Sequence, residues 1–134
     1  MRYKIIWPAG WRGERRVRVV RKRGSRAEYL KHKEVARLLT ENRISHYNKL
    51  YNFKINRIAI KNTKSRWGSC SKKGNLNFNY KIALLPIELA DYVIVHELCH
   101  LGELNHSSRF WKLIEMVLPN YKELRKRFQK DILL

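Results

Sequence analysis

The segment from residue 96 to residue 106, His-Glu-Leu-Cys-His-Leu-Gly-Glu-Leu-Asn-His, contains the side chains best suited to chemistry. His96 and His100 are four residues apart, so a helix would place them about 40° apart around its axis and about 6 Å apart along it. Two imidazoles so placed can bind one tetrahedral zinc ion, and His106 can add a third nitrogen after a short turn. Three protein ligands leave one coordination position open, which is typical of catalytic zinc sites.

Glu97 follows the first of these histidines, where its carboxylate would lie beside a metal instead of binding it. From there it can take a proton from a water molecule that the metal activates for attack on a substrate carbonyl. The pattern therefore predicts a zinc-dependent hydrolase in which Glu97 is the general base. His106 is the ligand that helix geometry does not fix, and Glu103 or Glu115 could take its place.

The residues around this motif predict a buried helix. Residues 92–95 are all apolar, and Leu98, Cys99 and Leu101 are interspersed with the motif. The alternative, an ordinary surface helix with a stripe of histidine and glutamate, does not explain these apolar neighbours. Because an unpaired buried polar group costs several kcal/mol, two histidines and a carboxylate in such a helix indicate a bound partner.

Length and composition predict one globular domain over residues 1–134, with a basic N-terminal segment over residues 1–25. Apolar residues make up 44% of the chain, enough for a core, but no apolar stretch reaches the roughly 18 residues of a membrane helix and no signal segment begins the chain. Cys70 and Cys99 have neither metal-site nor disulfide spacing, so we expect a cytoplasmic protein without membrane contact. Cys99 is expected to pack in the core, whereas Cys70 is either a small turn residue or a reactive thiol.

The net charge of +19 is distributed unevenly. Residues 61–85 hold six Lys or Arg and no acid, whereas residues 86–106 hold no Lys or Arg and four acids, namely Glu88, Asp91, Glu97 and Glu103. Acids near the motif suit a bound dication, and cations elsewhere suit nucleic acid or another polyanion. The alternative is a solvated basic surface with no dedicated ligand. The residues expected to form the basic surface are Arg15, Arg16, Arg18, Arg21, Lys22, Arg23, Lys61, Lys64, Lys72 and Lys73.

Hydrophobic periodicity and capping residues predict the elements that position the motif. Ser25 and Glu28 have capping-box spacing and begin a long helix, and Pro86 is placed to begin the helix that carries the motif. The predicted elements are a basic hairpin (residues 2–7 and 15–21), a helix to about residue 52, strands over 53–61 and 75–82, the motif helix over 87–101, a helix through residues 110–117, and a basic helix from Pro119 to about Asp131.

Three sequence blocks occur in order: RWGSCS at residues 66–71, GNLNFNY at 74–80, and HELCH followed by NHSSRFW at 96–111. With these blocks, the chain resembles the YgjP-like metallopeptidases, relatives of the SprT-like zincins. The resemblance covers about residues 30–130, whereas the first 25 residues show no match.

The resemblance implies a zincin-like fold of the minigluzincin type, an α+β architecture in which a small antiparallel sheet packs on the HExxH-bearing helix with flanking helices. It also implies that His96, His100 and His106 bind Zn²⁺ and that Glu97 is the catalytic base. The strand over 75–82 would border the cleft, where an extended peptide could pair with its backbone.

The same histidine spacing occurs in metzincins, which are a separate class of zinc peptidase. Metzincins require glycine at the position of Glu103 and a methionine turn afterwards. Met116 falls within a helical pattern instead, so the metzincin class is excluded.

The leading hypothesis is a zinc metallopeptidase that acts on proteins or peptides, with nucleic acid as a further partner. Tyr80, Tyr121 and Arg66 are the candidates for stabilising the oxyanion, although Arg66 and Trp67 also suit a structural turn with a packed indole. One alternative is a zinc-dependent hydrolase of nucleotides or other phosphates, which the cations of residues 61–85 would hold. Another is a nucleic-acid-binding module whose zinc is structural.

Overall fold

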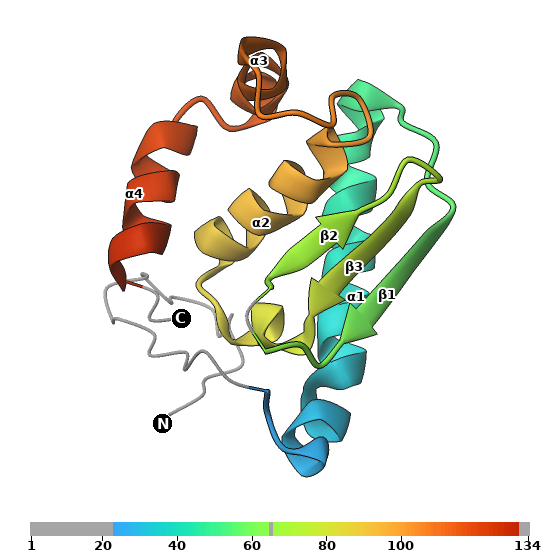
Figure 1. The fold of residues 1–134 in the computed structure, drawn as a ribbon. Helices are drawn as coiled ribbons and strands as arrows, with labels where there is room; N and C mark the ends of the chain where they lie inside the picture. Colours follow the sequence, from blue (N-terminus) through green and yellow to red (C-terminus); the bar gives the residue numbers. More distant parts are fainter. Residues whose placement is uncertain (1–22, 65, 132–134) are drawn as a thin grey trace.

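A computed structural model describes residues 23–64 and 66–131 of the chain (Figure 1). The predicted hairpin and most of the predicted arginine-rich cluster, residues 15–22, lie outside these described residues. The elements are α1 (Arg26–Tyr51), β1 (Arg57–Lys61), β2 (Gly68–Cys70), β3 (Asn75–Asn79), the 3₁₀ helix η1 (Tyr80–Leu84), α2 (Ile87–Cys99), α3 (Ser108–Val117) and α4 (Tyr121–Asp131). This arrangement confirms the predicted α+β class. No helix within the described ranges is long and apolar enough to cross a membrane.

The three strands form a mixed sheet in the order β1-β3-β2. β2 pairs with β3 in antiparallel fashion, with Gly68 opposite Phe78, as the prediction of an antiparallel sheet requires. However, β1 runs parallel to β3, with Arg57 opposite Asn75, so the prediction is wrong for this pair. The cause is the chain path: β2 reverses the direction of β1, and the turn closed by the Gly74 N–H to Ser71 O hydrogen bond (3.0 Å) reverses it again.

Both predicted strands are shorter in the structure than in the sequence pattern. The strand predicted over 75–82 ends at Asn79, whose side chain accepts a hydrogen bond from Lys81 N (3.0 Å) and begins η1. The strand predicted over 53–61 begins at Arg57 because the Asn48 side chain holds Phe53 through its N–H and C=O (2.8 and 2.9 Å). Buried side chains in a 3₁₀ helix and in a strand give similar apolar patterns, so periodicity alone could not place these ends.

Helix α1 begins where the sequence predicts, because Ser25 Oγ accepts a hydrogen bond from Glu28 N (3.1 Å). Its buried face differs from the apolar stripe that three- and four-residue spacing predicts, which includes Leu30, Leu38 and Leu50. The buried residues are His32, Ala36, Thr40 and Ile44, at successive i,i+4 positions. Leu30, Leu38 and Leu50 are each more than half exposed. At the middle of the helix, close packing therefore selects the smaller side chains of Ala36 and Thr40, with Leu39 half-buried beside them.

Helix α2 lies at the centre of the fold, between the sheet and α1 on one side and α4 on the other (Figure 1). Its apolar residues Leu89, Ile94, Leu98 and Cys99 are 0–1% exposed, which confirms the predicted buried helix and the packing role of Cys99. Pro86 is the N-cap residue of α2, whereas the sequence predicts it at the first helical position, N1.

One ion pair joins α1 to α2. Arg43 donates two hydrogen bonds of 2.7 Å to the Asp91 carboxylate, from Nε to Oδ1 and from Nη2 to Oδ2. The Tyr47 hydroxyl donates a third, to Asp91 Oδ2 (2.8 Å). Only 9% of the Asp91 side chain is exposed, so this residue has a structural role. The charge distribution had suggested that Asp91 lies among acids around a metal, and for this residue that suggestion is wrong.

We expect Asp91→Asn to lower the free energy of unfolding by about 2 kcal/mol, because the amide leaves Arg43 without its partner charge. The decrease should be smaller than for a fully buried pair, since a quarter of the Arg43 side chain is exposed. Urea unfolding measures it, with Glu34→Gln as control. Glu34 pairs with Arg37 on the exposed face of α1, where the substitution should have no measurable effect. Equal, small effects of both substitutions would contradict this assignment.

Candidate functional site

The three predicted histidines converge at the C-terminal end of α2. His96 lies in the last turn of the helix, His100 is its C-cap residue, and His106 comes from the loop before α3. Their Nε2 atoms are 3.3 Å (His96–His100), 3.1 Å (His100–His106) and 3.2 Å (His96–His106) apart. No other group of three or more His, Cys, Asp or Glu with metal-site spacing occurs among the described residues, and neither Glu103 nor Glu115 belongs to the histidine cluster.

The spacing of these nitrogens fits a metal ion. Tetrahedral zinc with Zn–N distances of about 2.0–2.1 Å requires nitrogens roughly 3.3 Å apart. Hydrogen bonding cannot account for all three contacts, because an Nε2 that carries a hydrogen cannot accept and one without a hydrogen cannot donate. At least one pair of these Nε2 atoms is therefore not hydrogen-bonded. Moreover, His100 Nδ1 contacts the Glu103 carbonyl oxygen at 3.0 Å, and a carbonyl can only accept. That contact assigns the ring proton to Nδ1 and leaves the lone pair on Nε2.

Aromatic rings of α3 hold the histidines in place. Phe110 stacks on His100 with ring centroids 4.4 Å apart and meets His96 edge-on at 5.0 Å. Trp111 stacks on His106 at 6.1 Å. The sequence pattern identified Phe110 and Trp111 as apolar residues of a helix but gave no sign that they border the histidines, because that contact depends on how α3 folds back onto α2.

Burial lowers the pKa values of two histidines in this site and raises the pKa of Glu97. It lowers the pKa of His96 to about 3, with smaller contributions from the nearby His100 and His106, and it also lowers the pKa of His100. These rings are therefore neutral at physiological pH, as metal ligands must be. Burial raises the pKa of Glu97 to about 7, so this carboxyl can both accept and release a proton near neutral pH.

Strand β2 approaches Glu97 closely because residue 68 is glycine. A Cβ atom at Gly68 would lie 2.8 Å from Glu97 Cγ and 3.1 Å from the Asn77 carbonyl oxygen. The strand beside Glu97 is thus β2, at the edge of the sheet, whereas the prediction placed the 75–82 strand at the cleft. That strand, β3, is the central one.

Helix α4 supplies residues that the sequence analysis missed. Arg125, Phe128 and Gln129 line a cavity of about 250 Å³ that also borders His96 and Glu97. Their three- and four-residue spacing places them on one face of a helix, but nothing in the sequence indicates that this face meets the active-site helix.

The three oxyanion candidates lie in different places. Tyr80 is fully buried and its hydroxyl contacts Glu28 Oε2 (3.2 Å), so that suggestion is wrong. Tyr121 stacks on Trp111, with centroids 5.4 Å apart, and Arg66 lines the cavity beside Glu97. Trp67 is 8% exposed, which confirms the prediction of a turn with a packed indole.

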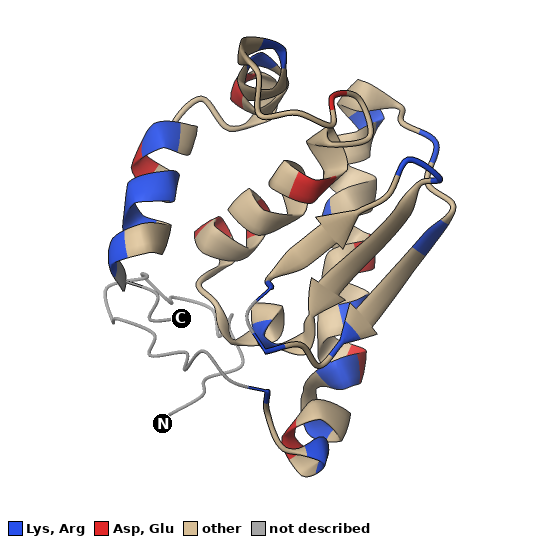
Figure 2. Ribbon diagram, in the orientation of Figure 1, with Lys and Arg blue, Asp and Glu red and all other residues tan. Residues whose placement is uncertain are grey.

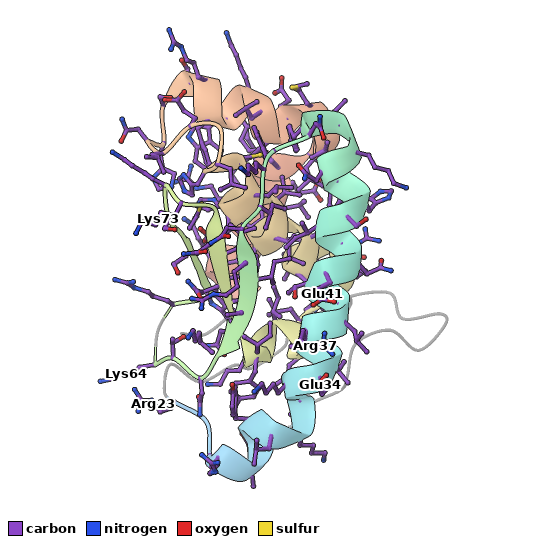
Figure 3. All side chains as sticks on the ribbon, turned by 90° about the vertical axis from the view of Figure 1, so that its right-hand side faces the viewer. Arg23, Glu34, Arg37, Glu41, Lys64 and Lys73 are labelled. Atoms are coloured by element: carbon purple, nitrogen blue, oxygen red, sulfur yellow. The ribbon has the colours of Figure 1, made fainter. Side chains whose placement is uncertain are left out.

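The predicted basic surface is not one patch within the described residues. Lys61 and Lys64 lie near the end of β1, whereas Lys72 and Lys73 lie in the turn between β2 and β3. Lys64 and Lys73 are at opposite ends of the sheet in Figure 3. Cations are denser on α4, which has five Lys or Arg against two acids (Figure 2).

Comparisons with known proteins agree with this geometry. Residues 14–131 match the profile of a family described as YgjP-like, metallopeptidase domain. The metallopeptidase zymogen abylysin of Pyrococcus abyssi has a similar structure, with 26% identity, a TM-score of 0.61 and coverage of 71% of this chain and 99% of that chain. The metallopeptidase zymogen jannalysin of Methanocaldococcus jannaschii is also similar, with 25% identity and a TM-score of 0.56. That match covers 71% of this chain and 94% of that chain.

A mutant of Wss1 from Saccharomyces cerevisiae is also similar, with a TM-score of 0.55 and coverage of 82% of this chain and 90% of that chain. Its identity is 14%, so this likeness concerns the fold alone. No curated protein sequence matches the chain. Together, the family profile and the solved structures confirm the zincin-like fold that the sequence blocks predicted.

The Cys70 thiol should be unreactive. Burial, and then the Glu97 charge, raises its pKa from 9.0 to about 11. It should therefore contain about 100-fold less thiolate at neutral pH than a thiol of ordinary pKa. We expect maleimide labelling of the native protein to be slow at pH 7 and to accelerate about tenfold per pH unit. Cys70→Ser is the control, since it leaves only the buried Cys99. Rapid labelling of Cys70 at pH 7 would instead support the reactive-thiol alternative.

Proposed function

Because the chain belongs to the YgjP-like metallopeptidase family, and is therefore a peptidase, we propose that it hydrolyses peptide bonds with a zinc ion held by His96, His100 and His106 and with Glu97 as general base. The observation that carries the proposal is the convergence of three Nε2 atoms, 3.1–3.3 Å apart, next to the half-buried carboxyl group of Glu97.

Each residue of the site has a definite role in this proposal. Zinc bound to the three imidazoles would polarise the scissile carbonyl and lower the pKa of a water molecule toward about 7. Glu97 accepts the proton of the attacking water and delivers it to the leaving amine, a transfer that a carboxyl of pKa about 7 performs in both directions. The Glu103 carbonyl orients the His100 ring through Nδ1.

We propose that an extended peptide substrate pairs with β2. This strand lies at the edge of the sheet, so one side of its backbone faces no other strand among the described residues. It also passes within contact distance of Glu97 at Gly68, where a side chain would obstruct the approach. Pairing by backbone hydrogen bonds would place the scissile bond beside the general base.

The two alternative functions are less well supported. A nucleotide hydrolase would hold its phosphates with the cations of residues 61–85, but Lys64 and Lys73 lie at opposite ends of the sheet. Of that set, only Arg66 lines the cavity beside Glu97. A structural zinc site would need four protein ligands, whereas the described residues offer three. The net charge of +19 still favours contact with nucleic acid, and that contact stays a prediction. The unpaired Cys70 and Cys99 support a reducing compartment, and we propose the cytoplasm.

The ligand assignment makes a quantitative prediction about metal binding. Replacing His96, His100 or His106 by alanine should weaken zinc binding by more than about 100-fold, since each removes one of three ligands. Titration of the metal-free protein with zinc measures this. Glu115→Ala is the matched control and should bind zinc normally, because Glu115 is exposed and outside the cluster. If His106→Ala bound zinc normally and Glu115→Ala did not, the assignment of the third ligand would be wrong.

Glu97→Gln should retain zinc and the fold but lower kcat on a peptide library by about 100- to 10,000-fold, because an amide cannot accept the proton. The measurement pairs turnover with zinc content and thermal unfolding of the same preparation. Loss of zinc in this variant would mark Glu97 as a ligand. Unchanged turnover would exclude it as the base.

A further inference from the structure

The cavity beside Glu97 has an apolar floor. Trp67, Tyr92 and Val93 are 8%, 7% and 5% exposed, and Phe128 closes the cavity from α4. The Phe128 ring lies edge-on to Trp67, with centroids 5.5 Å apart, and 6.1 Å from Tyr92. At about 250 Å³ the cavity is smaller than the roughly 300–1,000 Å³ of pockets for whole small molecules. It therefore suits one large apolar side chain of a longer substrate.

The rim of this cavity is cationic. Arg66, just before β2, and Arg125, on α4, both line the cavity and are both exposed. Neither forms an ion pair with any described residue. A guanidinium group offers several N–H donors in a plane and binds carboxylates in bidentate fashion. Two unpaired guanidinium groups at the mouth of an apolar cavity thus indicate a ligand that presents a carboxylate next to an apolar side chain.

Arg125 is held in position by the aromatic residues of the site. Its Cζ atom lies over the Trp111 ring, 4.9 Å from the centroid. The same Trp111 ring lies 6.1 Å from each of the His96 and His106 rings. A cation stacked in this way loses less side-chain freedom when it binds an anion.

From these contacts we propose that Arg66 and Arg125 are specificity-determining residues that bind a carboxylate of the peptide substrate, while an adjoining large apolar side chain fills the cavity. This inference rests on the proposed peptidase function. Because the cavity borders His96 and Glu97, the residue that fills it adjoins the scissile bond. The carboxylate comes either from the C-terminus of the substrate or from an acidic residue next to the apolar one.

Two matched peptide pairs separate these sources. The first pair is acetyl-Ala-Ala-Phe with a free C-terminal carboxylate and the same peptide as its amide. The second pair is acetyl-Ala-Ala-Phe-Glu-amide and acetyl-Ala-Ala-Phe-Gln-amide, which differ in one side-chain charge. Binding to the zinc-loaded Glu97→Gln protein is measured by calorimetry at about 0.15 M salt, where long-range attraction to the basic protein is screened. Turnover of the same peptides by the wild-type protein is the second readout.

We expect the carboxylate member of at least one pair to bind about tenfold more tightly than its neutral partner, as a charge-assisted hydrogen bond provides. Adding Arg125→Gln or Arg66→Gln should reduce this ratio to about threefold or less. Lys130→Gln is the matched control, because Lys130 is an exposed cation of α4 outside the cavity lining, and it should leave the ratio unchanged. A ratio between matched peptides does not respond to a general loss of stability.

Two outcomes would overturn the inference: equal binding of both members in both pairs, or no binding of any of the four peptides at millimolar concentration. An equal loss of discrimination in Arg125→Gln and Lys130→Gln would also overturn it, since the effect would then come from net charge. Failure of the proposed function is distinguishable, because in that case the carboxylate peptides would bind selectively but the wild-type protein would hydrolyse none of them.

Discussion

The site depends above all on one constraint, which is that α2 must stay fixed while its last turn carries polar side chains out of the core. Metal ligands tolerate errors of only about 0.2 Å in their distances, so small movements of the helix would separate the nitrogens. Burial of Leu98 and Cys99 fixes the turn between His96 and His100. The Arg43–Asp91 pair fixes the other end of the same helix to α1. Most of the fold can thus be understood as support for a single helix.

The same burial controls the electrostatics of the site. A low-polarity environment disfavours charge on any side chain, so burial lowers the pKa values of His96 and His100 and raises the pKa of Glu97 to about 7. One physical cause therefore leaves these two imidazoles with free lone pairs and gives Glu97 a carboxyl group that can exchange protons near neutral pH. Cations near the cluster would oppose a bound dication, and Arg125 remains compatible with one because it stacks on Trp111 at the rim and is exposed to solvent.

The sequence predicted those parts of the site that depend on local geometry. The four-residue spacing of His96 and His100 determines their common face on any helix, and the apolar neighbours indicated that this helix is buried. The order of the strands and the position of α4 were beyond prediction, because they depend on contacts between distant segments. The edge position of β2 is an example: its three residues carry no strand periodicity, and only the packing of Gly68 against Glu97 shows its role. The end of β3 at Asn79 was missed because side-chain capping, and not hydrophobicity, determines it.

Chemistry and substrate selection come from different parts of the chain. The histidines and Glu97 belong to α2 and the loop after it, and their positions follow from one helix and one turn. The cavity beside them is closed by Trp67 from the loop before β2 and by Phe128 from α4, which contact each other across it. Substitutions in those two segments can change the cavity and its cationic rim without replacing a residue of the histidine cluster, because neither segment supplies one. The fold therefore allows the substrate preference of this site to change while its hydrolytic centre stays the same.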